Sequence, residues 1–202
     1  MQLSHKAYHL GVFGSSGNGK TEYALRFIAN ARAAHVFLFD AEGEFAQRLA
    51  LPASRTVYEL DQAIGTGWIC FDPHIMFPGR LEVALEFFGT FTLEASRRLP
   101  GRKFFVVDEL GHYVTGHEVP QPIKTLVQTG RRSGVDGVFI SQQPNELHNT
   151  VRNQLTEVVC FQLQDDCALE FPKKFGFNLE AVRSLAPFHY ICRNKRGGET
   201  RG

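Results

Sequence analysis

Gly14-Ser15-Ser16-Gly17-Asn18-Gly19-Lys20-Thr21 is the most informative stretch of the chain, and it fits the pattern G-x-x-x-x-G-K-[ST] at every fixed position. The glycines allow the backbone to wrap closely around an anion. The N–H groups of the loop and of the following helix point at that anion. A lysine at position 20 can reach the β- and γ-phosphates of a nucleotide, and the Thr21 hydroxyl can ligate Mg²⁺. The stretch therefore predicts a phosphate loop (Walker A motif) for ATP and Mg²⁺.

Short apolar runs alternate with amphipathic stretches on both sides of this loop, which is typical of an α/β fold with a parallel sheet. We predict strands at His9–Phe13, His35–Phe39, Thr56–Leu60, Trp68–Phe71, Phe104–Val107, Gly137–Ile140, Val158–Leu163 and His189–Arg193. We predict helices at Thr21–Ala33, Glu44–Leu49, Leu81–Leu99, Gln121–Arg131, Glu146–Glu157, Ala168–Phe175 and Leu179–Leu185. The phosphate loop would thus join a strand to a helix, as its chemistry requires.

A second acidic motif follows the apolar run Phe104–Val107 and consists of Asp108 and Glu109. Ligands of open parallel sheets bind at the carboxyl ends of the strands, which is where these carboxylates fall. We expect Asp108 to hold the Mg²⁺ shell through water, and Glu109 to act as the general base that polarises an attacking water. An acidic pair alone could simply close a strand, but beside a phosphate loop it favours a hydrolase.

Two further features follow in the chain. Gln142 ends the predicted strand Gly137–Ile140, where it could sense a γ-phosphate or merely cap the strand. Arg131 and Arg132 end a predicted helix, where arginines are ordinarily solvated and favoured by the helix dipole. The alternative is an arginine finger that completes the site of a neighbouring subunit, worth roughly 10³- to 10⁵-fold in rate.

Asp40 and Glu44 follow the second predicted strand, near the presumed site. Two interpretations stay open for this pair. The carboxylates either contact the water shell of Mg²⁺ or cap the next helix, and capping is the commoner use of acidic residues at such a position.

Taken in order, these motifs resemble the FtsK–HerA superfamily of DNA-pumping ATPases. The selective part is the run from Gly130-Arg131-Arg132-Ser133-Gly134 to Val138-Phe139-Ile140-Ser141-Gln142-Gln143-Pro144, since many families share the phosphate loop. The resemblance spans His9 to Phe188. The short chain looks most like the viral genome-packaging ATPases of icosahedral viruses with double jelly-roll capsids.

The resemblance implies a RecA-like core, a ring of five or six subunits and double-stranded DNA passing through its centre. It implies nucleotide and metal roles for Lys20 and Thr21, a metal role for Asp108, water activation by Glu109 and sensing by Gln142. It makes Arg131 or Arg132 the finger acting in trans. It also implies partners at the capsid vertex or in a membrane, and a location in the host cytoplasm and at the packaging vertex of the virion.

The bulk composition limits other classes of function. The chain has 202 residues, a length that fits one domain. Its net charge of +1 does not by itself indicate nucleic-acid binding. We find no signal peptide and no run of 18 apolar residues. We expect one ATPase domain over residues 1–193 and a basic, mobile tail over residues 194–202.

DNA would then be held through its phosphates by local basic patches. The candidates, each of which could equally be a solvated charge, are Arg97, Arg98, Arg102, Lys103, Lys173, Lys174 and the arginines of the tail. Three other functions are weighed: a conjugation or export ATPase of the same superfamily, a small-molecule kinase, and a binding module without turnover. The position of Glu109 argues against a kinase.

Overall fold

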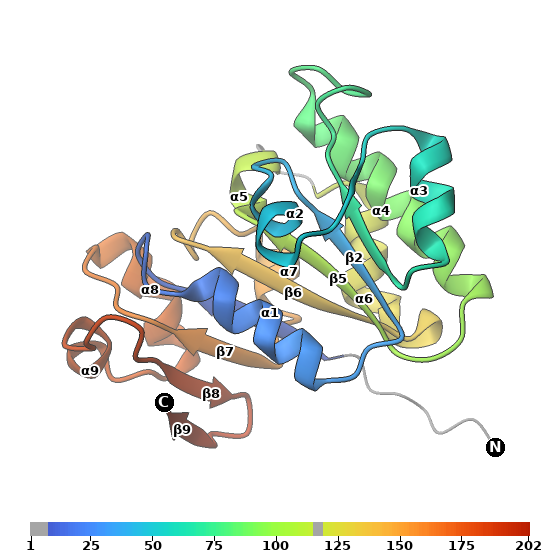
Figure 1. The fold of residues 1–202 in the computed structure, drawn as a ribbon. Coiled ribbons are helices and arrows are strands. Elements are labelled where there is room, and N and C mark those ends of the chain that lie inside the picture. The colour runs from blue at the N-terminus through green and yellow to red at the C-terminus, as the bar shows by residue number, and fades with distance from the viewer. Residues whose placement is uncertain (1–7, 115–118) are drawn as a thin grey trace.

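The computed structural model describes residues 8–114 and 119–202, without the side chains of residues 131–133. Its described part is built on a nine-stranded sheet of order β3-β4-β2-β5-β6-β1-β7-β8-β9 (Figure 1). The strands are β1 His9–Phe13, β2 His35–Phe39, β3 Ala53–Ser54, β4 Trp68–Phe71, β5 Lys103–Asp108, β6 Val135–Ser141, β7 Glu157–Cys160, β8 Ile191–Asn194 and β9 Glu199–Arg201. Strands β1 to β7 pair in parallel, whereas β8 pairs antiparallel with β7 and β9 pairs antiparallel with β8. This is the predicted α/β class with a mostly parallel central sheet.

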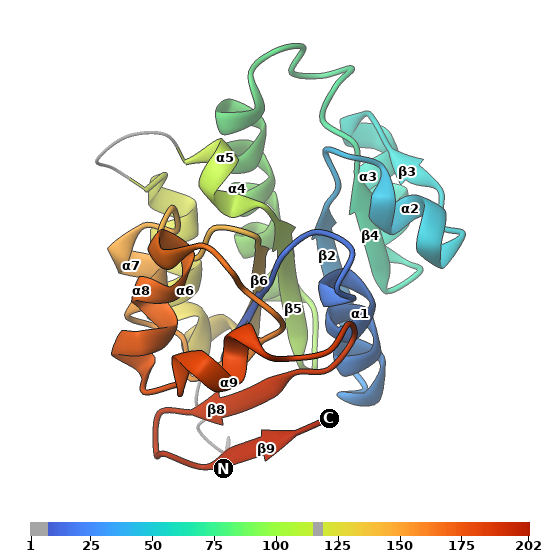
Figure 2. The same ribbon diagram turned by 90° about the vertical axis from the view of Figure 1, so that its left-hand side faces the viewer.

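Helices cover both faces of the sheet (Figure 2). They are α1 Lys20–Asn30, α2 Glu44–Leu49, α3 Val57–Ile64, α4 Leu81–Arg98, α5 Leu110–Tyr113, α6 Gln121–Ser133, α7 Asn149–Arg152, α8 Asp166–Phe175 and α9 Leu179–Arg183. Side chains alternate along each strand, so β2 places Val36 and Leu38 in the core under α1, and Phe37 and Phe39 in the core under α4. Strands buried on both faces read as continuous apolar runs, which is why the sequence revealed them.

Two predicted elements are wrong. The predicted strand Thr56–Leu60 is helix α3, because Thr56 forms a capping box with Glu59: Glu59 N–H donates to Thr56 Oγ1 over 3.2 Å, and Thr56 N–H donates to Glu59 Oε2 over 3.0 Å. Only α7 is helical within the predicted helix Glu146–Glu157. The helix cannot continue to Glu157, because Thr156 N–H donates to the His9 carbonyl over 2.8 Å and β7 begins at the next residue.

The tail, for which the sequence predicts no regular structure, ends in strand β9 on the edge of the sheet. Asn194 Oδ1 accepts N–H groups from Arg196 at 2.9 Å and from Gly198 at 3.1 Å, and Gly197 has φ 86°. An Asn side chain that accepts from nearby N–H groups, followed by a glycine at positive φ, makes a tight turn. The turn returns the chain along β8 and ties Gly202 N–H to the Tyr190 carbonyl over 3.2 Å.

His9 joins the phosphate-loop strand β1 to its neighbours through both ring nitrogens. Gly137 N–H donates to Nδ1 over 2.9 Å, so the proton sits on Nε2, which donates to the Val127 carbonyl over 2.9 Å. The ring is 2% exposed, and burial lowers the pKa of His9 below its ordinary value of 6.5. The folded protein therefore holds this imidazole in its neutral form.

We expect this histidine to make folding less favourable in mild acid. The unfolded chain binds the proton more readily, so the stabilisation is complete above about pH 6.5 and is lost below it, by up to about 1.4 kcal/mol per pH unit. Urea unfolding from pH 7.5 to 5.5 measures the loss. The matched control is His9→Gln, whose amide keeps a donor and an acceptor but cannot titrate. Parallel pH profiles for the two proteins would contradict the expectation.

Candidate nucleotide-binding site

The phosphate loop connects β1 to α1 at the carboxyl edge of the sheet, with β6 lying between β1 and the acidic strand β5. Gly19 is the N-cap of α1 with φ 92°, a backbone conformation that a side chain strains. Gly14 packs against Phe161, whose Cβ would lie 2.6 Å from a Cβ at position 14. The loop is therefore fixed by close packing as well as by backbone freedom.

Hydrogen bonds tie the loop to the segment that follows β7. Ser15 N–H donates to the Gln162 carbonyl over 2.9 Å, and Asn18 Nδ2 donates to the same oxygen over 3.4 Å. Lys20 Nζ donates to the Ser15 carbonyl over 3.1 Å and is thus folded across the loop. Burial lowers the pKa of Lys20, while the charges of Glu109, Asp108 and Glu44 raise it. This lysine is a desolvated cation that faces three carboxylates.

Thr21 and Asp108 meet at the first turn of α1. The Thr21 hydroxyl lies 3.3 Å from Asp108 Oδ2 and 3.5 Å from Glu44 Oε2. Burial, and then the charge of Glu109, raise the pKa of Asp108 to about 6, although Lys20 acts in the opposite direction. Negative charge is thus under-compensated at this point, which favours a cation.

Glu109 turns the chain out of β5 in a left-handed conformation with φ 49° and ψ 45°. Its carboxylate accepts the Ser141 hydroxyl at 3.1 Å, and each of its oxygens lies 3.1 Å from the Gln142 N–H. A non-glycine residue in this conformation is strained, and such strain gathers at functional sites. Gln142 contacts Glu109 through its backbone N–H. Its side-chain amide, the group predicted to sense the γ-phosphate, does not make this contact.

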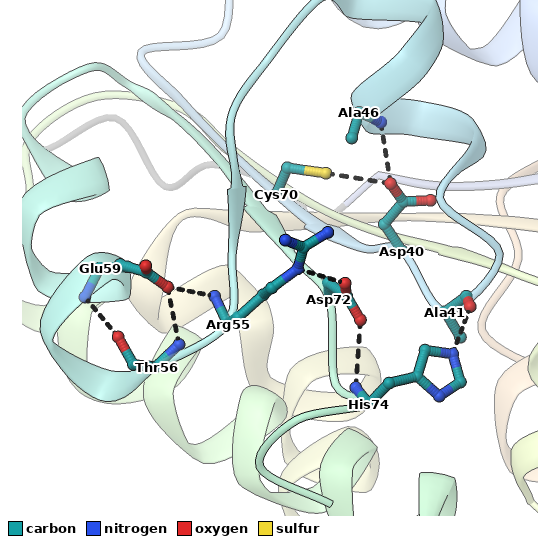
Figure 3. A network of polar contacts seen from close by, with 9 residues as sticks. All are labelled: Asp40, Ala41, Ala46, Arg55, Thr56, Glu59, Cys70, Asp72 and His74. Carbon is teal, nitrogen blue, oxygen red and sulfur yellow. Dashed lines mark hydrogen bonds and ion pairs between the residues drawn. The ribbon is translucent and has the colours of Figure 1, made fainter. Parts of the chain in front are cut away.

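Glu44 reaches the site because Asp40 fixes the start of α2. Asp40 Oδ1 accepts Phe45 N–H at 3.0 Å. Asp40 Oδ2 accepts Ala46 N–H at 2.8 Å and the Cys70 thiol at 3.3 Å (Figure 3). The sequence leaves two interpretations open for Asp40, and these contacts show that it caps helix α2. Glu44, the first residue of α2, is the residue that faces Thr21.

The remainder of the network in Figure 3 stiffens the loops that follow β2 and β4. Arg55 Nε lies 2.7 Å from Asp72 Oδ2, and His74 Nε2 donates to the Ala41 carbonyl over 2.7 Å. These contacts support the site from one side without entering it.

A cavity of about 1080 Å³ opens over the loop. Among the predicted residues, Ser16, Gly17, Gly19, Lys20, Thr21, Asp108, Glu109 and Gln142 line it. Five phenylalanine and tyrosine residues that the sequence analysis does not assign to the site also line it: Tyr23, Phe27, Phe161, Phe188 and Tyr190. Arg131 and Arg132 belong to the last turn of α6, and their side chains lie outside the described part.

Two of the basic candidates for DNA contact are engaged within the fold. Arg102 Nε lies 2.6 Å from Oδ2 of the buried Asp136, and Lys103 is 3% exposed with Nζ donating to the Gly101 carbonyl over 2.9 Å. A charge engaged in this way is not presented to a phosphate backbone.

The fold and the site define a phosphate-loop nucleotide-binding protein. Residues 6–89 match the family model of the central domain of helicase HerA. The match covers less than half of the chain, and it is to the superfamily that the order of motifs resembles.

Solved structures share the fold at low identity. The genome packaging NTPase B204 of Sulfolobus turreted icosahedral virus 2, in complex with AMPPCP, superposes with a TM-score of 0.77 at 14% identity over 96% of each chain. The DNA-packaging ATPase B204 of Sulfolobus Turreted Icosahedral Virus gives 0.75 at 13%, again over 96% of each. The type VII secretion ATPase EccC of Thermomonospora curvata gives 0.55 at 13%, over 96% of this chain and 25% of that one. No curated protein sequence matches the chain.

Within the described residues, no helix is both long and apolar enough to cross a membrane. Nor do the described residues contain a group of three or more His, Cys, Asp or Glu side chains arranged to hold a metal ion by themselves.

Proposed function

We propose that the protein binds ATP and Mg²⁺ at the Gly14–Thr21 loop, hydrolyses the nucleotide and uses the reaction to move double-stranded DNA into a preformed viral capsid. The observation that carries the proposal is the meeting of Thr21 with Asp108 at 3.3 Å, directly beside Lys20 and Glu109. Phosphate-loop ATPases place a hydroxyl, a carboxylate, a lysine and a base together in this way.

The residues present fit Mg²⁺. A hydroxyl and a carboxylate are oxygen ligands, which Mg²⁺ prefers, and it is commonly bound by one or two carboxylates together with substrate phosphates. Burial first, and then the charge of Glu109, raise the pKa of Asp108, and a bound cation would favour its charged form. Thr21 and Asp108 would hold the ion, with Glu44 next to them, and the ion would neutralise charge on the β- and γ-phosphates.

Other residues of the chain would bind the phosphates, activate the water and respond to the γ-phosphate. Lys20 would exchange its contact with the Ser15 carbonyl for the phosphates, and the loop N–H groups would bind the same anion. Glu109 would accept a proton from the attacking water, with Ser141 and the Gln142 N–H fixing the direction of its carboxylate. Gln142, at the edge of the same cavity, would respond to the γ-phosphate.

The motor part of the proposal includes self-association into a ring. An arginine from α6 of a neighbouring subunit, Arg131 or Arg132, would complete each site in a ring of five or six copies. A ring multiplies weak contacts to the DNA backbone, so the modest charge of +1 per chain is sufficient. Capsid-vertex or membrane-anchored proteins would hold the ring at the packaging vertex, in the host cytoplasm and on the virion.

Packaging is favoured over protein or DNA export by the extent of the structural match. This chain and the packaging NTPase B204 cover 96% of each other, whereas the chain covers 25% of the secretion ATPase EccC. The shared fold therefore extends over nearly the whole of this chain and of the packaging NTPase.

Displacement of a triplex-forming oligonucleotide from double-stranded DNA tests the proposal. We expect displacement that requires ATP and Mg²⁺ and is abolished in Lys20→Ala. Displacement that proceeds equally without ATP, or no displacement under conditions in which the protein hydrolyses ATP, would contradict translocation.

A further inference from the structure

We propose that Phe188 stacks on the base of the bound nucleotide, and that the aromatic group Phe161, Phe188 and Tyr190 forms the base-binding end of the cavity. The inference rests on the proposed nucleotide site, and it identifies the base-binding part of that site, for which no sequence motif indicates a residue.

The cavity has two chemically different ends. One end holds the carboxylates of Glu44, Asp108 and Glu109, which suits the Mg²⁺-bound end of the phosphate chain. Since the phosphates occupy the loop, the base must leave towards the opposite end, on the β7–β8 side of β1. The aromatic group lies there: Phe161 follows β7, and Phe188 and Tyr190 precede β8.

Phe188 is held over the loop although its ring faces solvent. The ring is 68% exposed, and its Cδ1 would lie 3.1 Å from a Cβ at Gly19. An exposed phenylalanine at the wall of a polar cavity leaves an apolar face without a covering group. A planar heterocycle would cover that face, because nucleobases stack on aromatic side chains.

The backbone supports the same conclusion. His189 N–H donates to the Ala186 carbonyl over 3.1 Å, so Pro187 and Phe188 are the central residues of a β-turn. Phe188 has φ 67°, at the turn position where glycine is favoured. A bulky residue in this conformation is strained, and strain of this kind clusters at ligand clamps.

The turn and the floor beneath it are fixed. Tyr190 N–H donates to the Gly202 carbonyl over 2.8 Å, which anchors the turn to the end of β9. The rings of Phe161 and Tyr190 lie 5.6 Å apart, and Tyr23 of α1 packs 4.7 Å from Tyr190. Stacking reads the face of a base and not its hydrogen-bonding edge, so this end of the cavity accepts any base and prefers purines for their larger area.

Calorimetric titration with AMPPCP and with inorganic tripolyphosphate, each with Mg²⁺, tests the assignment. The two ligands share the phosphates and differ in the nucleoside. We expect Phe188→Gly to weaken AMPPCP binding about 5- to 150-fold and to leave tripolyphosphate binding unchanged. Glycine suits the turn, so this variant folds, and Phe188→Tyr should retain wild-type affinity for both ligands.

Tyr58→Ala is the matched control, because Tyr58 is 73% exposed on α3 and lies outside the cavity. Unchanged AMPPCP affinity in Phe188→Gly would overturn the assignment, as would an equal loss for both ligands. In either case, the phosphate site would still be supported if the wild-type protein binds both ligands and Lys20→Ala binds neither. A wild-type protein that binds neither ligand would overturn the site and the assignment together.

Discussion

Replacing Glu109 with glutamine should leave ATP bound and slow its hydrolysis by about 10²- to 10⁴-fold. The substitution keeps the size of the side chain and an oxygen that can accept from Ser141 and the Gln142 N–H, now 3.1 Å from the carboxylate. It removes the base that takes a proton from water. Single-turnover hydrolysis, with nucleotide binding measured separately by calorimetry, distinguishes the two effects.

Glu42→Gln is the matched control for this experiment. Glu42 lines the same cavity, so the variant removes the same charge without touching the carboxylate beside Asp108. We expect it to hydrolyse ATP at close to the wild-type rate. Full activity in Glu109→Gln would show that Glu109 is not the general base. A loss of ATP binding would show that Glu109 positions the nucleotide instead.

The paired substitution Arg131→Ala/Arg132→Ala should lower ATP turnover by about 10³- to 10⁵-fold, because an arginine finger stabilises charge that develops on the transferred phosphoryl group. The pair lies at the end of α6, just before Gly134 closes the helix with φ 66°. Steady-state hydrolysis without DNA measures the loss. Arg97→Ala/Arg98→Ala, which removes two adjacent arginines from the end of α4, is the control and should retain turnover.

Mixing subunits shows whether the arginines act in trans. Glu109→Gln subunits keep their arginines but lack the base, so they should restore turnover to the double-arginine variant in mixed rings. Failure to restore any activity, although the two variants assemble together, would place the arginines in the site of their own subunit or outside catalysis.

Burial explains which parts of the fold were predictable. The central strands were found because their residues are buried on both faces, so that β2 and β5 are nearly all apolar in sequence. Thr56–Leu60 was misassigned although its T-x-x-E pattern is a helix-start signal. Strand β9 was missed because it is exposed throughout and depends on the turn at Asn194, which carries no apolar pattern.

The site divides in the same way. The phosphate loop and Asp108-Glu109 are contiguous motifs whose chemistry can be read directly from the sequence. Glu44 reaches Thr21 only because Asp40 sets the angle of α2, and Phe188 reaches the loop only through the turn after Pro187. Contacts of this kind join segments distant in sequence, and no local pattern encodes them.

ATP hydrolysis measured as a function of double-stranded DNA concentration tests the central claim most directly. For a DNA motor, we expect that turnover by the wild-type protein with Mg²⁺ rises with DNA length and concentration and falls with added salt, because the contacts are to phosphates. We also expect no turnover in Lys20→Ala. Wild-type turnover that is the same with and without DNA at low salt would contradict a DNA motor.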